Sequence, residues 1–326
     1  MRRELPRGRS ARARPLRSPL GAALAALLTL AACTVEESRG PAALRFCGIP
    51  DADKAALTRQ YAAVAEWLGA ELGRPVEYVH VPDYTGAVAA LAADKVDFAW
   101  LGGVTAVEAE AATDGQAVFL AARESDLHFR SYFVANRAHV ASGRFHEVAT
   151  REPQPLSELA ALAPALARGT FSFGAKSSTS GHIMPRHFLE SPEVGIDPET
   201  DFLRPAGYQL QGGHAATLAA VASGLVDAGV LNYASWEAAD ADTRARAPVV
   251  YVTPEYVDYC LVGHARLGAA LCARLRDAFT GLDAADPREA AVLAAFSAER
   301  FVPADPAAWD GIRAVLASAR ARGVLD

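Results

Sequence analysis

Three consecutive hydroxyl-bearing residues, Ser178, Thr179 and Ser180, form the stretch of this chain whose side chains are most suited to chemistry. They follow the apolar, strand-like segment Phe171–Phe173 and precede Ile183–Leu189, where apolar residues recur with helical spacing. This order predicts a strand, a polar turn and the start of a helix. Because the first-turn N–H groups of a helix are unpaired and its dipole favours negative charge, the turn is predicted to bind an anion.

A nucleotide site, a hydrolytic nucleophile and a plain helix cap are the alternatives to an anion site at this turn. The phosphate-binding loop G-x-x-x-x-G-K-[ST] is nearly matched by residues 169–177, but Ala175 separates the second glycine from Lys176. The turn lacks the nucleophile motifs G-x-S-x-G and S-x-x-K. A Ser or Thr that caps a helix without binding a ligand is common, so this last alternative stays open.

Residues 1–32 have the features of an export signal. Seven arginines precede the apolar run Leu20–Ala32, which is too short to span a membrane dependably and ends in a Leu-Ala-Ala-Cys33 sequence. This ending resembles the lipobox of bacterial lipoproteins, so we predict a signal peptide over 1–32, a lipidated linker over 33–42 and acylation of Cys33. The mature protein would then lie in the periplasm or cell envelope, held to the membrane by lipid only. An ordinary signal peptide with an incidental cysteine is the alternative.

Removal of the signal makes the chain more acidic. The whole sequence has a net charge of −6, and the mature part keeps 25 basic and 37 acidic residues because residues 1–32 contain seven arginines and one glutamate. This balance argues against nucleic acid as a partner. It also means that an anion must be bound through local backbone and hydroxyl donors, because the long-range field of the protein repels it.

The cysteines and histidines predict neither a metal site nor a cofactor. After Cys33 the chain has Cys47, Cys260 and Cys272, which allow at most one disulfide and form no C-x-x-C motif. A Cys47–Cys260 disulfide and buried free thiols are both open alternatives. Five histidines lack metal-ligand spacing: His128, His139, His146, His182 and His187.

Strand and helix patterns alternate at the start of the mature chain. Strands over 44–50, 76–81 and 96–101 alternate with helices over 51–72 and 84–94. This alternation predicts a mainly parallel sheet, with ligands at the carboxyl ends of its strands. Further strands are predicted at 130–135, 202–203, 226–231, 249–253 and 259–262, and further helices at 156–166, 267–281, 287–296 and 306–322. Residues 141–155 lack apolar periodicity, which predicts an exposed excursion.

Two segments of the same length share one apolar pattern. Residues 84–97 and 214–227 each begin with a ring side chain, Tyr84 or His214, and each end in Val-Asp. Both read as a helix, a turn and the start of a strand, so the two rings would stand at helix N-termini and could face one another across a cleft. Chance agreement between alanine-rich helices is the alternative.

Nearly the whole mature chain resembles the phosphonate/phosphite-type periplasmic solute-binding proteins of ABC importers. Four stretches carry the resemblance: Asp83–Gly86, Val96–Gly102, Ser178–Pro185, and Gly213-His214 leading to Val226-Asp227. A second likeness, to the selenate-importer branch of these proteins, is carried by Trp100–Gly103, Phe133–Asn136 and Val257–Tyr259.

The resemblance implies an α/β, type 2 periplasmic binding protein fold. Two lobes, each with a mainly parallel sheet flanked by helices, would be joined by a hinge that the chain crosses twice. We predict that one lobe comprises residues 43–130 plus 250–326 and the other residues 131–249. Such a protein is expected to be a monomer.

The resemblance also assigns roles in ligand binding. Five residues match positions that hydrogen-bond the head of a tetrahedral oxyanion: Tyr84, Ser178, Thr179, Ser180 and His214. Asp258 matches an acidic residue at the rim of the cleft, and Phe129 and Gly181 are additional candidates; Phe129 stands where many members have Tyr. Ala234 falls where binders of aminoalkylphosphonates have a Glu for the amine, so an aminoalkyl tail has no obvious partner. This favours a small inorganic oxyanion over 2-aminoethylphosphonate as the ligand.

These features predict a binding lipoprotein that captures a small oxyanion and delivers it to the transmembrane permease subunits of an ABC importer. The candidate ligands are phosphonate, phosphite, phosphate, selenate and selenite. Ionised Asp258 would accept a hydrogen bond from a protonated oxyanion and repel an oxyanion that has no proton; a role as a simple turn cap is the alternative. Two other functions stay open: an exported hydrolase that uses Ser178 or Ser180 with His214 and Asp258, and a sensory binding protein.

Overall fold

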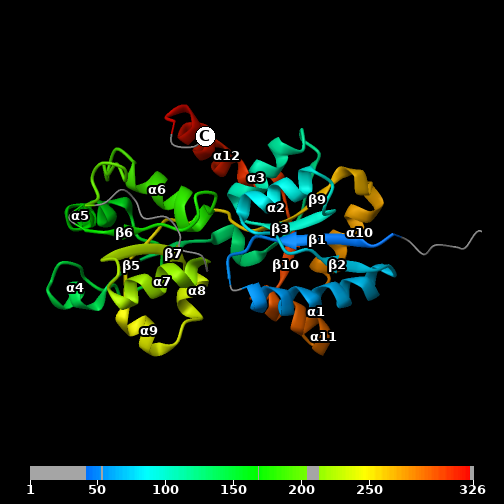
Figure 1. Cartoon of the computed structure of the whole chain (residues 1–326), viewed down its shortest axis with the longest axis horizontal. Coiled ribbons are helices and arrows are strands. Elements are labelled where there is room, and N and C mark those ends of the chain that lie inside the picture. The colour runs from blue at the N-terminus through cyan, green and yellow to red at the C-terminus, as the bar shows by residue number, and fades with distance from the viewer. Residues whose placement is uncertain (1–41, 53, 168, 204–212, 324–326) are drawn as a thin grey trace, which may run out of the picture. The chain divides into compact units, whose positions relative to one another are not determined.

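The computed structural model describes residues 42–52, 54–167, 169–203 and 213–323 (Figure 1). These residues form two β-sheets, each flanked by helices. The predicted signal peptide, Cys33 and all but the last residue of the predicted linker lie outside the described residues. No helix within the described ranges is both long and apolar enough to cross a membrane.

The first lobe is built on a six-stranded sheet with the strand order β10-β4-β9-β3-β1-β2. Its strands are β1 (Leu44–Gly48), β2 (Val76–Tyr78), β3 (Phe98–Leu101), β4 (Ala117–Arg123), β9 (Cys260–His264) and β10 (Phe301–Pro303). Its helices are α1 (Lys54–Leu72), α2 (Tyr84–Ala92), α3 (Gly103–Ala112), α10 (Ala269–Thr280), α11 (Pro287–Ala295) and α12 (Asp310–Ala321), with the short turns η1 (Glu124–His128), η3 (Ala265–Leu267) and η4 (Pro306–Trp309). The apolar residues that predict α1, among them Leu57, Tyr61 and Leu68, are buried.

The second lobe is built on a four-stranded sheet with the order β6-β7-β5-β8. Its strands are β5 (Ser131–Ala135), β6 (Phe171–Ser172), β7 (Ala228–Asn232) and β8 (Val249–Val252). Its helices are α4 (Arg137–Ala141), α5 (Leu156–Leu166), α6 (Met184–Leu189), α7 (Gly213–Ser223), α8 (Tyr233–Glu237) and α9 (Ala241–Arg246), and the π-helical turn η2 (Thr179–Ile183) leads into α6.

Both sheets are mixed, with antiparallel strands among parallel ones. β1 pairs in parallel with β2 and β3, and β6 with β7, whereas β9 and β5 run antiparallel to both of their neighbours. β5 and β9 are the strands through which the chain enters the opposite lobe, so they join each sheet from the reverse direction. The strand predicted at 202–203 is absent, because Phe202 and Leu203 lie in a bend.

The chain passes between the lobes twice, before β5 and between β8 and β9. The two crossing segments are hydrogen-bonded to each other: Phe129 N donates to the Tyr256 carbonyl at 2.9 Å, and Tyr256 N donates to the Phe129 carbonyl at 3.0 Å. β8 pairs with β5 and therefore belongs to the four-stranded sheet. The exact division of residues between the lobes stays a prediction.

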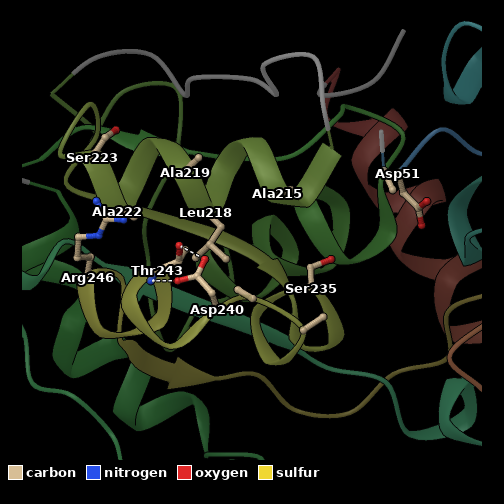
Figure 2. Close-up of a pocket in the computed structure, with 13 residues that line it drawn as sticks. Asp51, Ala215, Leu218, Ala219, Ala222, Ser223, Ser235, Asp240, Thr243 and Arg246 are labelled. Atoms are coloured by element: carbon tan, nitrogen blue, oxygen red, sulfur yellow. Dashed lines mark hydrogen bonds between the residues drawn. The ribbon is translucent and has the colours of Figure 1, made fainter. Parts of the chain in front are cut away.

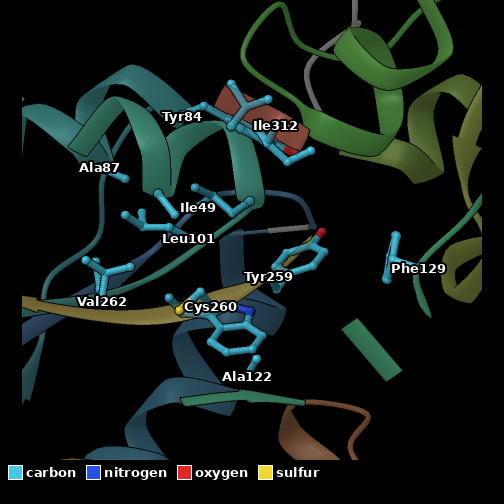
Figure 3. Packing of buried hydrophobic residues seen from close by; sticks show 14 of the residues in the cluster. Ile49, Tyr84, Ala87, Leu101, Ala122, Phe129, Tyr259, Cys260, Val262 and Ile312 are labelled. Atoms are coloured by element: carbon cyan, nitrogen blue, oxygen red, sulfur yellow. The ribbon is translucent and has the colours of Figure 1, made fainter. Parts of the chain in front are cut away.

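The cysteines within the described ranges are free and buried. In the six-stranded sheet Cys47 pairs with Ala99 and Cys260 with Leu101, so strand β3 separates the two thiols. Cys260 packs among apolar side chains of this sheet, near Leu101 and Val262 (Figure 3). A Cys47–Cys260 disulfide is therefore incompatible with the strand order.

Candidate anion-binding site

The turn predicted to bind an anion leads from β6 into α6 through the π-helical segment η2. Ser178 caps this segment: its Oγ accepts a hydrogen bond from Gly181 N at 3.0 Å. Gly174 N donates to the Gly181 carbonyl at 2.6 Å, which ties the start of the turn to its middle. Ser178 is thus a helix cap, but the cap uses only its oxygen and leaves the O–H hydrogen available to donate.

Thr179 is also held through its hydroxyl oxygen, in this case by a backbone N–H group of the opposite lobe. Its Oγ1 accepts a hydrogen bond of 2.9 Å from Val104 N, in the first turn of α3. An N–H group that points at the hydroxyl oxygen directs the O–H hydrogen elsewhere. Thr179 therefore joins the two lobes and still has a hydrogen to donate.

Ser180 lies at the buried end of the turn, where the hinge approaches. Its carbonyl accepts a hydrogen bond of 2.6 Å from Ser131 Oγ, which is also 2.5 Å from the Tyr256 hydroxyl. The Ser180 hydroxyl lies close enough to Asp258 and Tyr256 to stabilise negative charge on either.

Tyr84 stands at the N-terminal end of α2, as predicted. The helix is capped by Asp83, whose Oδ1 accepts from Gly86 N at 2.6 Å. The Ser178 hydroxyl lies near enough to the Tyr84 phenol to stabilise its charged form in part. Burial, with a further contribution from the Asp51 carboxylate, raises the pKa of Tyr84 well above its usual value, so the phenol stays a neutral donor.

His214 lies in the first turn of α7 and is only 2% exposed. Asn232 N points at its Nδ1 at 3.4 Å, so Nδ1 is the acceptor and the ring proton resides on Nε2. Burial lowers the pKa of His214 to about 4, so the imidazole is neutral. Nε2 is buried and has no hydrogen-bond partner among the described residues. A buried N–H donor of this kind requires an acceptor that the described protein atoms do not supply.

Asp258 is the single carboxylate in this cluster of donors. Gly103 N, in the first turn of α3, donates to its Oδ1 at 2.9 Å. The hydroxyls of Thr179 and Ser180 lie near enough to stabilise its charged form, yet Oδ2 has no properly oriented partner in the described part of the chain. Burial outweighs these contacts and raises the pKa of Asp258 to about 7.

Two glycines lie where these side chains converge. A Cβ at Gly181 would come within 2.9 Å of Ser178 Oγ and 3.1 Å of His214 Cε1. A Cβ at Gly102 would come within 3.2 Å of Asp258 Oδ1 and 3.3 Å of Thr179 Oγ1. We name the surrounding side chains the oxyanion cradle: Tyr84, Ser178, Thr179, Ser180, His214 and Asp258. The structure thus brings together six residues that the sequence distributes over four distant regions.

Phe129 and Gly181 play different parts. Gly181 lies within the turn, where its missing side chain permits the contacts just described. Phe129 is fully buried in the hinge, with its ring 5.0 Å from that of Tyr233 and 5.7 Å from that of Tyr259. An aromatic ring without a hydroxyl gives this position an apolar wall in place of a donor.

The cradle therefore offers neutral donors and one carboxylate acceptor. Hydroxyl, phenol and imidazole N–H groups suit the oxygens of an anion, and a carboxylate suits a proton on that anion. The described residues show no hydrogen bond that links His214 to Asp258 or to the hydroxyl of Ser178 or Ser180. His214 Nδ1 faces a backbone N–H and no carboxylate, so the hydrolase alternative lacks the orientation that a catalytic triad requires.

Sequence reasoning predicted backbone donors at this turn but missed the backbone N–H groups that orient the side chains of the site. Gly103 N, Val104 N and Asn232 N orient Asp258, Thr179 and His214, respectively. The Gly102-Gly103 pair directly after a buried strand was a signal for a helix start here, since glycine permits close approach of other groups to the backbone. The partner of each N–H could not be read from the chain.

A larger groove of about 630 Å³ lies beside α7, α8 and α9 (Figure 2). Alanines of α7 form much of its lining, including Ala215, Ala219 and Ala222. Asp240 Oδ1 accepts from Thr243 N at 2.8 Å, and Arg246 pairs with Asp242 at 2.6 Å. Because these charged residues already have partners, the groove is a poorer candidate for an anion site than the cradle.

Comparison with known proteins finds one matching family and a similar relative. Residues 46–309 match the family described as "ABC transporter, phosphonate, periplasmic substrate-binding protein". The probable ABC transporter phosphite binding protein PhnD1 of Prochlorococcus marinus strain MIT 9301 is 30% identical over 282 residues, which are 84% of this chain and 89% of that protein.

Solved structures of similar proteins share the fold. PhnD1 from Prochlorococcus marinus in complex with methylphosphonate has a TM-score of 0.75 and 28% identity, covering 88% of this chain and 100% of that one. A binding protein component of an ABC phosphonate transporter from Pseudomonas aeruginosa has a TM-score of 0.69 and 22% identity, covering 85% and 86% of the two chains. These likenesses confirm the predicted two-lobed type 2 periplasmic binding protein fold.

Proposed function

Because the chain belongs to the family of periplasmic substrate-binding proteins of phosphonate ABC transporters, we propose that it binds a phosphonate or phosphite that retains one proton and delivers it to its permease. Proteins of this family bind a transported solute and are not enzymes. The similar proteins are named for phosphite and phosphonate, and one was solved with methylphosphonate. None of these names supports the predicted likeness to the selenate branch.

Two buried atoms without hydrogen-bond partners in the described part of the chain indicate which ligand the site favours. His214 Nε2 is a buried donor, and Asp258 Oδ2 is a buried acceptor, and neither has a partner among the described residues. A phosphonate or phosphite with one proton satisfies both, since its charged oxygens accept from His214 and the hydroxyls while its P–OH donates to Asp258. The proton shared with Asp258 removes the repulsion between two negative charges.

Selenate and sulfate are disfavoured for the same reason. At neutral pH these ions have no proton to donate, so the ionised form of Asp258 would face an oxygen lone pair, and only its protonated form, which the pKa of about 7 allows in part, could donate to them. Phosphate and selenite hold a proton near neutral pH and remain candidates that binding measurements must separate from phosphonates. The shape of the cradle, and not charge alone, has to make that distinction.

A thermal-shift panel on the protein without residues 1–33 tests the proposal, because a ligand that binds only the folded state raises the melting temperature. We expect phosphite and methylphosphonate to stabilise the protein, and sulfate and selenate to leave the melting temperature unchanged. Mass spectrometry of the released ligand should recover it unaltered. Stabilisation by selenate alone, or release of a hydrolysed ligand, would contradict the proposal.

The membrane tether is a separate proposal. Supporting it are the Leu-Ala-Ala-Cys33 ending of the apolar run and the family's periplasmic location. Replacement of Cys33 with Ser removes the thiol that would be acylated, so Cys33→Ser should shift the full-length protein from the membrane to the soluble fraction. Detergent partitioning checks this. Equal partitioning of variant and wild type would refute the lipoprotein assignment.

A further inference from the structure

Helix α12 is packed into the first lobe but ends against the second. Within the first lobe, Ile312 is buried and Arg313 Nε donates to Glu110 Oε2 of α3 at 2.9 Å. Arg322 directly follows the helix, and its Nη2 lies 2.7 Å from Glu190 Oε2, at the end of α6 in the second lobe (Figure 1). α12 therefore extends from one lobe to the other.

The other end of α12 is connected to the oxyanion cradle. Trp309, in the turn η4 directly before the helix, is fully buried, and its Nε1 donates to the Asp258 carbonyl at 2.9 Å. The Trp309 ring packs against Phe119 of β4, with the ring centroids 5.1 Å apart. A shift of α12 relative to the first lobe would therefore be felt at the backbone of Asp258.

A groove of about 500 Å³ lies between α12 and α6. Met184 and His187 of α6 line one side of it, and Val315 and Ser318 of α12 line the other. Tyr256, from the second crossing between the lobes, also lines the groove. Rotation of the lobes about this crossing would change the separation of the two helices.

The ion pair lies about one helical turn beyond this groove. Arg322 follows Ser318 by four positions and Glu190 follows His187 by three, so each charged residue shares a helix face with a residue of the groove. Burial and the Arg322 charge lower the pKa of His187, which agrees with a position of Arg322 alongside α6. The pair therefore joins the two helices at the end of the groove.

Glu190 faces two arginines, one from each lobe. Arg186 Nε, on the same helix, donates to Oε1 at 2.7 Å, whereas Arg322 lies at Oε2. Oε2 receives no aligned hydrogen bond from the described residues, so Arg322 holds it by charge attraction. Loss of Arg322 would leave Glu190 paired with Arg186, so α6 should stay folded while its link to α12 is lost.

We propose that α12, anchored by Trp309 in the first lobe and by Arg322 on the second, is a strap that stabilises the lobe arrangement in which the cradle is complete. The same arrangement brings Val104 N to Thr179 Oγ1 across the lobes. A contact that favours the binding-competent state raises the apparent affinity for every ligand by the same factor. Arg322 thus sets affinity without touching the ligand, and the strap does not depend on which oxyanion the cradle holds.

Calorimetric titration of the protein lacking residues 1–33 with methylphosphonate and phosphite tests the strap. Partly exposed ion pairs are weak, so Arg322→Gln should lower both affinities by the same factor, about two- to fivefold. Arg322→Glu brings like charges together and should lower both further. Arg322→Lys should bind nearly as wild type does, because the pair needs a charge and not a guanidinium fork. Added salt should reduce the difference between wild type and Arg322→Gln, since it screens the pair.

Arg320→Gln is the matched control, because it removes the same charge from an exposed position near the same end of α12 and should bind as wild type does. X-ray scattering of the ligand-free protein adds a measurement that needs no ligand: Arg322→Glu should have a larger radius of gyration than wild type or Arg320→Gln. Unchanged or tighter binding by Arg322→Glu, or a loss confined to one of the two ligands, would overturn the strap and leave the proposed function intact. If neither ligand bound wild type, the proposed function would fail, and equal radii would then overturn the strap as well.

Discussion

Thr179 is the residue at which a helix-cap role and a ligand-binding role separate most cleanly. Thr179→Val keeps the side-chain shape and removes the hydroxyl that the structure places between Val104 N and the cradle. A hydrogen bond to a charged group contributes about 1.5–3 kcal/mol, so the affinity for methylphosphonate should fall by roughly ten- to a hundredfold. Calorimetric titration measures this. Ser177→Ala removes a hydroxyl from the same turn outside the cradle and should bind as wild type does; an equal loss in both variants would count against the cradle.

Asp258 should make the stability of the ligand-free protein depend on pH. Burial raises its pKa from 3.8 to about 7, so its contribution to stability is fully present below 3.8 and is lost as the pH rises through 7. The pKa of His214 is lowered to about 4, so its contribution has the opposite sign, but wild type and Asp258→Asn share it. Between pH 4.5 and 7.5 the melting temperature of wild type should therefore fall relative to that of Asp258→Asn.

Glu108 provides a matched control for this measurement. It lies on α3 outside the cradle, and burial raises its pKa to about 7 as well. Glu108→Gln should change the pH dependence of melting in the same direction, but it should bind methylphosphonate with unchanged affinity. Asp258→Asn should in addition bind sulfate better relative to methylphosphonate, because an amide N–H can donate to an unprotonated oxygen. If Asp258→Asn preferred methylphosphonate over sulfate as strongly as wild type does, this result would contradict the role given to the carboxylate.

At the scale of elements, the π-helical turn η2 depends on Gly181. A side chain there would meet Ser178 Oγ at 2.9 Å, Gly174 Cα at 3.1 Å and His214 Cε1 at 3.1 Å. Gly181→Ala should therefore cost about 1–3 kcal/mol of folding stability and also weaken phosphonate binding, because the turn must shift. Denaturant unfolding and calorimetry report the two effects.

Gly311 in α12 is the matched glycine, since a Cβ there meets nothing within 4 Å. Gly311→Ala should stabilise the protein by up to about 1 kcal/mol, as expected for an exposed helical position, and leave binding unchanged. If the two alanine variants were indistinguishable, close packing around Gly181 could not be what shapes the site.

The sequence predicted elements well where local pattern decides them. The helix at 54–72 and the strand–turn–helix order around residue 178 follow from apolar spacing and from turn residues, which need no tertiary information. α3 and β4 were missed, because α3 starts at a Gly-Gly pair that looks like a turn and is rich in alanine, without a clear apolar stripe. The antiparallel direction of β5 and β9 depends on how the chain re-enters each lobe, which no local pattern records.

The candidate site also has some parts that the sequence predicts and others that only the folded structure reveals. The hydroxyl turn, Tyr84 and His214 carry side-chain signals in the sequence, and all lie in the cradle. Backbone donors such as Val104 N become part of the site only when the other lobe approaches. The contact between Asp51 and Tyr259 joins residues 208 positions apart, so only the folded chain could reveal it.

At the scale of the whole molecule, binding should close the two lobes. Val104 N and Thr179 Oγ1 meet across the lobes, and the paired crossings at Phe129 and Tyr256 form a narrow connection about which they can rotate. Ligand that engages both sides should favour the closed state and reduce the radius of gyration. X-ray scattering with and without saturating methylphosphonate checks this. An unchanged radius at saturation would count against a closing cleft.

The buried neutral donors of the cradle and Asp258 together should select a phosphonate or phosphite that keeps a proton. Titration calorimetry of wild-type protein at pH 7, with methylphosphonate and sulfate in parallel, tests this most directly. We expect one methylphosphonate per chain with a Kd of about 1 μM or lower, equivalent to about 8 kcal/mol of binding free energy, and no measurable binding of sulfate. Sulfate binding as tightly as methylphosphonate, or methylphosphonate binding only in the millimolar range, would contradict this selection.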